Sequence, residues 1–204
     1  MNKHQQKWNK RYAASELVWS VQPNVLFASE VANLTPGKAL DVACGEGRNA
    51  IWLADKGWEV TAIDYADAAV AKGVSMADRR GVFVNWVVAD IADVEKSQYD
   101  LVAVLYFHTG QNERQEWLPT VVNCVAPKGS FIYIGHDPSN ICYGVGGPRD
   151  PALLPSVEEI TNCLKGFKIE DARVVERRTN KETGHDNATT GLAFDTFVSA
   201  IREL

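Results

Sequence analysis

Long hydrophobic runs and clustered cysteines are both scarce in this chain of 204 residues. No apolar run approaches the roughly 18 residues that a membrane-spanning helix needs, and the N-terminus lacks the hydrophobic core of a signal peptide. The four cysteines lie far apart and form no Cys-x-x-Cys pair: Cys44, Cys124, Cys142 and Cys163. We therefore expect a cytoplasmic protein with reduced thiols and neither a disulfide framework nor a zinc knot.

Positively charged residues are also fewer than negatively charged ones. The chain has 21 Lys and Arg against 26 Asp and Glu, a formal net charge of −5. This balance argues against a broad surface for nucleic acid or anionic membranes. One basic cluster, at Lys3, Lys7, Lys10 and Arg11, fits a solvated helix face or a phosphate-binding arm. We expect a small-molecule substrate, with neither nucleic acid nor membrane as a partner.

The length and the hydrophobic content of 46% are ordinary for one globular domain spanning residues 1–204. An apolar periodic run after Pro23 predicts a helix that ends near Thr35–Gly37. We interpret residues 1–35 as an N-terminal cap or lid.

Short apolar segments then alternate with helical patterns. Strands are expected at Lys38–Val42, Glu59–Ile63, Phe83–Val88, Tyr99–Leu105 and Ser130–Gly135. The expected helices between them are Asn49–Lys56, Ala66–Arg80 and Gln111–Val125. Strands rich in Val and Ile that alternate with helices predict a doubly wound α/β sheet, mostly parallel and covered on both faces.

The last third of the chain does not continue the alternation of strands and helices. Residues 136–155 are rich in Gly and Pro and lack a period, which predicts a long loop on the substrate side. The capping-box pattern Ser156–Glu159 begins a short helix that reaches Leu164. Two β-rich segments, Ile169–Arg178 and Thr190–Ile201, flank a polar turn and predict a C-terminal antiparallel hairpin. The hairpin completes a seven-stranded sheet.

The most informative stretch runs from Ala39 to Asn49. An apolar strand carries Asp41 near its end and leads through Gly45-Glu46-Gly47 into a helix. Glycines let a ligand approach the backbone closely, and the helix start presents unpaired N–H groups. Asp64 and Asp90 follow the next two strands, and ligands bind at these carboxyl ends in α/β sheets. Asp64 lies 19 residues after Gly45, a spacing suited to a ribose diol. The pattern predicts a site for a nucleotide-like cofactor.

Two other interpretations stay open. Gly45-x-Gly47-x-x-Ala50 also fits the dinucleotide fingerprint, so a NAD(P)-dependent enzyme is one alternative. Asp41 disfavours it, because a negative charge beside the turn suits an ammonium group better than a pyrophosphate. The other alternative is a non-catalytic protein that binds the cofactor.

These residues carry a family resemblance. Residues 40–47 resemble motif I of class I S-adenosylmethionine-dependent methyltransferases, and Asp64 and Asp90 match the second and third cofactor motifs. More narrowly, Trp8–Tyr12 and Gly47–Asn49 are similar to tellurite-resistance-type and thiopurine-type methyltransferases. The sequence departs from the family at Ala43, where a glycine is common.

The resemblance implies S-adenosylmethionine as the cofactor and a methyltransferase with a Rossmann-like fold. Gly45, Gly47 and the backbone near Leu105 would line the methionine portion, and Asp41 would hold its ammonium. Asp64 would bind the ribose, and Asp90 with the Ile91 backbone would meet the adenine. Arg11 is a candidate partner for the methionine carboxylate, with a surface role as the alternative.

The acceptor side offers two candidate catalytic residues, His108 and His136, at the ends of neighbouring strands. Either could act as a general base. A base is needed for an alcohol or ammonium acceptor but not for a thiolate or chalcogen oxyanion, the soft class that the narrower resemblance favours. Aromatic residues could wall the pocket: Trp8, Tyr12, Trp19 and Tyr143. We expect no metal, because His108, His136, Asp137 and Cys142 match no known ligand spacing.

Overall fold

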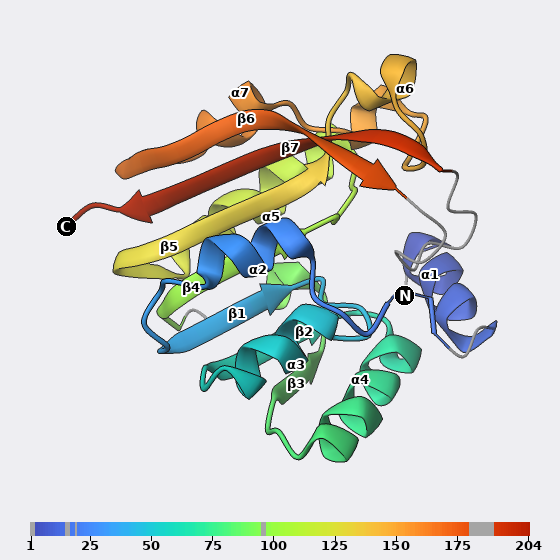
Figure 1. Cartoon of the computed structure of the whole chain (residues 1–204), viewed down its shortest axis with the longest axis vertical. Coiled ribbons are helices and arrows are strands. Elements are labelled where there is room, and N and C mark those ends of the chain that lie inside the picture. Colours follow the sequence, from blue (N-terminus) through green and yellow to red (C-terminus); the bar gives the residue numbers. More distant parts are fainter. Residues whose placement is uncertain (1–2, 15–16, 19, 95–96, 180–189) are drawn as a thin grey trace.

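The computed structural model describes residues 3–14, 17–18, 20–94, 97–179 and 190–204 (Figure 1). Seven strands form one sheet in the order β3-β2-β1-β4-β5-β7-β6. The strands are β1 (Lys38–Val42), β2 (Glu59–Asp64), β3 (Asn85–Val88), β4 (Tyr99–Leu105), β5 (Val125–His136), β6 (Phe167–Thr179) and β7 (Gly191–Arg202). Strands β1 to β5 pair in parallel, and β7 runs antiparallel to both β5 and β6. The predicted mostly parallel sheet with a C-terminal hairpin is confirmed.

Helices cover both faces of this sheet. They are α1 (Lys3–Ala14), α2 (Val25–Val31), α3 (Arg48–Asp55), α4 (Asp67–Arg80), α5 (Gln111–Asn123), α6 (Asn140–Tyr143) and α7 (Val157–Thr161), with short 3₁₀ turns at Ile91–Asp93 and Pro151–Leu153. Because side chains alternate along a strand, Phe131 and Tyr133 of β5 pack into one core with α5 and α7, and Ile132 into another with α2 and α3. In the described ranges no helix is long and apolar enough to cross a membrane.

The boundary between α5 and β5 differs from the prediction. We expected a helix to Val125 and a strand from Ser130. Instead α5 ends at Asn123, and Val125 already pairs with Tyr99 of β4. The pairing then shifts register, so that Leu101 faces Ser130. Residues 126–129 bulge out between these pairs, and their Pro and Gly were the reason for placing a loop there.

Residues 136–155 are mostly irregular, as predicted, although they include the short α6 and the turn at Pro151–Leu153. Two buried polar side chains hold this segment to β7. Asp137 accepts a hydrogen bond from Thr196 at 2.9 Å. Asn140 accepts one from the Phe194 N–H at 2.8 Å and donates to the Gly146 carbonyl at 3.0 Å. The segment therefore has a defined position above the sheet.

The N-terminal helix α1 lies beside α4 (Figure 1). Asn9 accepts a hydrogen bond from the Ala68 N–H at 3.0 Å, and the Lys72 ammonium donates to the Tyr12 carbonyl. These contacts bring α1 to the carboxyl edge of the sheet. The polar turn predicted between β6 and β7, with His185, lies outside the described residues.

Candidate active site

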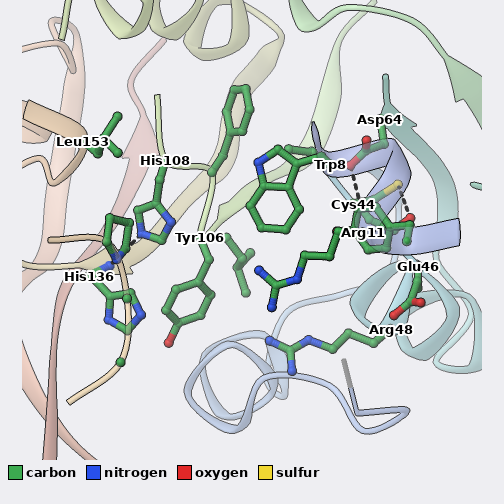
Figure 2. A pocket seen from close by; sticks show the side chains of 18 of the residues that line it. Trp8, Arg11, Cys44, Glu46, Arg48, Asp64, Tyr106, His108, His136 and Leu153 are labelled. Atoms are coloured by element: carbon green, nitrogen blue, oxygen red, sulfur yellow. Dashed lines mark hydrogen bonds between the residues drawn. The ribbon is translucent and has the colours of Figure 1, made fainter. Parts of the chain in front are cut away.

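A cavity of about 790 Å³ lies at the carboxyl ends of the parallel strands. It is bounded by α1, the turn after β1, the end of β4, and residues 145–150 of the segment after β5. The predicted site residues that line it are Arg11, Asp41, Gly45, Gly47, Asp64, Leu105, His108 and His136. Figure 2 shows labelled side chains of α1 and of the turn on one side and the histidines on the other. The topology thus joins both predicted halves of the site.

Asp64, at the end of β2, is fixed by the glycine turn. One carboxylate oxygen accepts the Gly45 N–H at 2.8 Å, and the other accepts the Ala66 N–H at 2.8 Å. Burial raises the pKa of this carboxyl, and the backbone donors oppose the rise. Each carboxylate oxygen can accept more than one hydrogen bond, so the group can still accept bonds from a ligand diol.

Asp41, at the end of β1, is nearly fully buried, at 1% exposure. Its Oδ2 atom has no hydrogen-bond partner among the described residues. Burial raises the pKa of Asp41 to about 7, and the Ala50 N–H and the charge of Arg48 counteract this rise. A buried carboxylate with an unused oxygen at the wall of a cavity is suited to a cationic ligand group.

The turn itself uses left-handed backbone. Ala43 has φ 53°, Gly45 55° and Gly47 75°. Ala43 therefore adopts a conformation that favours glycine, the residue common there in the resembled family. A Cβ on Gly47 would lie 2.2 Å from the Trp86 ring of β3. Gly47 is needed for the packing of Trp86, which the sequence analysis missed.

Glu46, between the two glycines, connects the turn to the N-terminal segment. Its carboxylate is 2% exposed and accepts the Val18 N–H at 3.0 and 3.1 Å. Lys72 of α4 lies 3.1 Å from the same carboxylate. The turn, α4 and the residues after α1 therefore form one connected wall of the cavity.

Asp90 and Ile91 are absent from the described lining of this cavity. Asp90 caps a 3₁₀ turn by accepting the Ala92 N–H at 3.2 Å, and it accepts a second bond from Gln5 of α1 at 2.9 Å. Ile91 is buried in the core. Nothing in the sequence indicates that α1 packs over the end of β3, and the role of Asp90 and Ile91 toward the adenine stays a prediction.

A second polar cluster centres on Asp195 of β7, which is 1% exposed. Tyr106 donates to its carboxylate at 2.8 Å and Arg177 of β6 at 2.6 Å, and His136 Nδ1 lies 3.0 Å away. Burial raises the pKa of Asp195, but the bonds from His136 and Arg177 outweigh it and hold the pKa below its ordinary value.

Sequence reasoning missed Tyr106, Arg177 and Asp195. The sequence does contain a signal for Asp195, which is a charged residue within the apolar run of β7. It does not indicate that Asp195 pairs with His136. Asp195 faces His136 directly across the β5–β7 pairing, and that register follows from the folded hairpin.

The two predicted histidines have different environments. Their rings stack with centroids 5.4 Å apart, and His108 Nε2 accepts the backbone N–H of His136 at 3.3 Å. Burial and the neighbouring His136 lower the pKa of His108 to about 3, so its ring is neutral. Gly147 packs against the His136 ring, since a Cβ there would lie 2.4 Å from it.

The aromatic walls are partly as predicted. Trp8 and Tyr12 line the cavity, and the Arg11 guanidinium lies 5.1 Å from the Trp8 ring centroid. Tyr143 does not line it: this side chain is 77% exposed and contacts Phe194. Trp19 lies outside the described residues. No group of three or more potential metal ligands occurs among the residues that the structure describes.

Known proteins resemble this chain in part of its sequence and in its fold. Residues 39–129 match the sequence model of the methyltransferase domain. The chain is 28% identical over 163 residues to the 2-heptyl-1-hydroxyquinolin-4(1H)-one methyltransferase of Mycobacteroides abscessus, covering 75% of this chain and 69% of that protein. Further relatives align over less than half of their own length.

Solved structures share the fold. TehB from Haemophilus influenzae superposes with a TM-score of 0.69 and 16% identity, covering 89% of this chain and 63% of TehB. The magnesium protoporphyrin IX methyltransferase of Synechocystis with bound S-adenosylmethionine has a TM-score of 0.63 and 18% identity, covering 98% and 80%.

Proposed function

We propose that the chain is a class I S-adenosylmethionine-dependent methyltransferase that methylates a small-molecule acceptor bound in the cavity. One observation carries the proposal: Asp41 presents a buried, unused carboxylate oxygen beside the glycine turn, in the same cavity as the His136 pair with Asp195. A cation site and a proton-accepting site in one cavity suit methyl transfer from a sulfonium to a nearby nucleophile.

The residues present fit the cofactor. Asp41 would bind the methionine ammonium, Arg11 the methionine carboxylate, and Asp64 the ribose hydroxyls. Gly45, Gly47 and Leu105 would lie against the methionine portion. Asp90 and Ile91 do not line the described cavity, and Gln5 of α1 is bonded to the Asp90 carboxylate at 2.9 Å, so α1 would have to move aside for these two residues to meet the adenine.

When bound, S-adenosylmethionine supplies a methyl group on an already activated sulfonium. The chain's own residues must then align the acceptor and exclude water. Trp8 and Tyr12 of α1 and residues 145–150 would close the cavity around it. His136, oriented by Asp195, would accept a proton from an acceptor that carries one. His108 would position His136, because its Nε2 accepts the His136 backbone N–H.

Two acceptor classes remain candidates. An aromatic hydroxyl is favoured by the His136–Asp195 pair and by the relative from Mycobacteroides abscessus, whose name specifies a hydroxyquinolone. A soft thiol or chalcogen nucleophile is favoured by the similarity of Trp8–Tyr12 and Gly47–Asn49 to tellurite-type and thiopurine-type enzymes. Loss of the base separates them, because only the hydroxyl must be deprotonated.

The test of the proposed function is calorimetric binding of S-adenosylhomocysteine and of NAD, followed by turnover on a panel of small hydroxyl and thiol acceptors. We expect binding of the first ligand only, and turnover of at least one acceptor. Tight NAD binding would support the dinucleotide alternative. Cofactor binding without turnover on any acceptor would support a non-catalytic protein.

Asp64→Ala is the matching variant. It removes charge-assisted bonds worth about 1.5–3 kcal/mol each, so affinity for S-adenosylhomocysteine should fall about tenfold or more. Asp67→Ala is the control, because Asp67 is an exposed residue in the first turn of α4 and does not line the cavity.

A further inference from the structure

Guanidinium groups gather at one part of the cavity, although the whole chain carries a net charge of −5. Arg11 comes from α1, Arg48 from the start of α3, and Arg177 from β6. Figure 2 shows Arg11 and Arg48 extending toward Tyr106. Arg177 lies 5.6 Å from the centroid of the same Tyr106 ring. Three positive charges that line one cavity favour a negatively charged ligand.

Arg48 has few partners of its own. Its Nη1 donates to the Ser20 hydroxyl at 3.3 Å, and no carboxylate of the described residues forms an ion pair with it. Burial lowers the pKa of Arg48, Tyr106 and Asp41 oppose this shift, and the positive charge of Arg177 adds to it. A guanidinium carries five N–H donors, so Arg48 retains donors for a ligand.

Arg177 is oriented by Asp195. Its Nε and Nη2 atoms donate to the two Asp195 oxygens at 2.6 and 3.4 Å. The Asp195 charge is shared with His136 and Tyr106. This arrangement fixes the plane of the Arg177 guanidinium and leaves Nη1 free of that pairing. The side chain is 23% exposed and lines the cavity.

The cofactor accounts for only one of these groups, since its single carboxylate is assigned to Arg11. We propose that Arg48 and Arg177 together bind a carboxylate on the methyl acceptor, next to Tyr106. This inference rests on the proposed function and adds the charge of the acceptor to it. The apolar side chains of Phe107, Val145 and Leu153 line the same cavity, so the carboxylate belongs to an apolar or aromatic acid.

Two guanidinium groups bind a carboxylate far better than a neutral amide of the same shape. Their bonds to the carboxylate are charge-assisted, whereas the NH₂ group of an amide is itself a donor and would face the guanidinium N–H donors. The carboxylate of the acceptor would thus contribute to binding, and a different atom of the acceptor would be methylated. Interactions of this kind, made equally before and during transfer, lower KM with little effect on kcat.

The test uses two probes, 4-hydroxybenzoate and 4-hydroxybenzamide, titrated by calorimetry into protein saturated with S-adenosylhomocysteine. We expect the acid to bind about tenfold or more tightly than the amide. Arg48→Gln and Arg177→Gln should each reduce that preference to about threefold or less. Arg173→Gln is the control, because Arg173 lies on the same strand, is paired with Asp171, and does not line the cavity.

Equal affinities of the native protein for the two probes would overturn the inference. A preference for the acid over the amide that persists in both Arg48→Gln and Arg177→Gln would also overturn it. If Arg48→Gln instead weakens S-adenosylhomocysteine binding by about tenfold or more, Arg48 serves the cofactor and the inference is wrong for that residue. If Arg177→Gln unfolds because the ion pair with Asp195 is lost, the result for Arg48→Gln alone decides the test. Failure of the proposed function would be recognised separately, as absence of S-adenosylhomocysteine binding.

Discussion

The carboxylate of Asp195 lies 3.0 Å from His136 Nδ1, and the two residues face each other across the β5–β7 pairing. With a proton on Nδ1 facing this carboxylate, Nε2 would be the basic nitrogen of the ring. The same carboxylate binds Tyr106 and Arg177, so its removal would disturb the orientation of several side chains of the acceptor side.

Asp195→Asn should therefore lower kcat for a hydroxyl acceptor by about tenfold to a hundredfold, with a smaller effect on S-adenosylhomocysteine affinity. Steady-state rates check this, with Asp171→Asn on β6 as the control, because Asp171 pairs with Arg173 away from the cavity. An unchanged kcat would remove Asp195 from the account.

The two histidines should respond differently to substitution. His136→Ala should reduce turnover about a hundredfold or more on an acceptor that must lose a proton. His108→Ala should cost less, because His108 has a pKa of about 3 and its Nε2 already accepts a backbone N–H. On a thiolate or chalcogen oxyanion both variants should stay close to the native rate. Cofactor affinity is measured alongside, so that a binding defect is not mistaken for lost catalysis.

Gly47 should matter for stability as well as for binding. Gly47→Ala places a Cβ 2.2 Å from the Trp86 ring, in a left-handed backbone conformation. We expect a loss of about 2–5 kcal/mol, the sum of strain and overpacking. Gly57→Ala has the same backbone penalty with no atom within 4 Å, so it should cost only about 1–2 kcal/mol. Denaturant unfolding of both variants measures the difference; equal losses would show that Trp86 does not restrict Gly47.

The sequence was enough to predict the sheet, its hairpin and most of the cavity lining. Apolar strands that end in Asp41 and Asp64 indicate both the element and its functional edge. Contacts that depend on folded geometry were missed. The Asp195–His136 pair depends on strand register, and the bond from Gln5 to Asp90 depends on how α1 packs. Gly47 was understood as a ligand cradle, while its nearest constraint is a tryptophan from another strand.

The contacts of α1 lead to a prediction about motion. Because Gln5 of α1 is bonded to Asp90, and Asp90 does not line the cavity, adenine binding there would require α1 to shift. Amide hydrogen exchange in α1 and in residues 136–155 should change on adding S-adenosylhomocysteine, with slower exchange once the ligand is enclosed. The amides of α5, away from the cavity, serve as an internal reference. Identical exchange with and without ligand would mean that neither segment acts as a lid.

Asp41 is expected to reduce the stability of the ligand-free protein. Its pKa is raised to about 7 by burial, so the folded state holds the proton more tightly than the unfolded state does. This contribution to stability is present below the unfolded pKa and is lost as the pH rises toward 7. At pH 8, Asp41→Asn should stabilise the ligand-free protein by on the order of 1–4 kcal/mol. A variant less stable than the native protein would contradict this.

The affinity of S-adenosylhomocysteine as a function of pH tests the central claim most directly, because the claim is that Asp41 binds the cofactor ammonium. The carboxylate is charged only above its pKa of about 7, so the native affinity should rise from pH 5.5 to 8 and then level off. Asp41→Asn should bind about tenfold or more weakly at pH 8 and show little of this rise. A native affinity that is flat over this range and equal to that of Asp41→Asn would contradict the account.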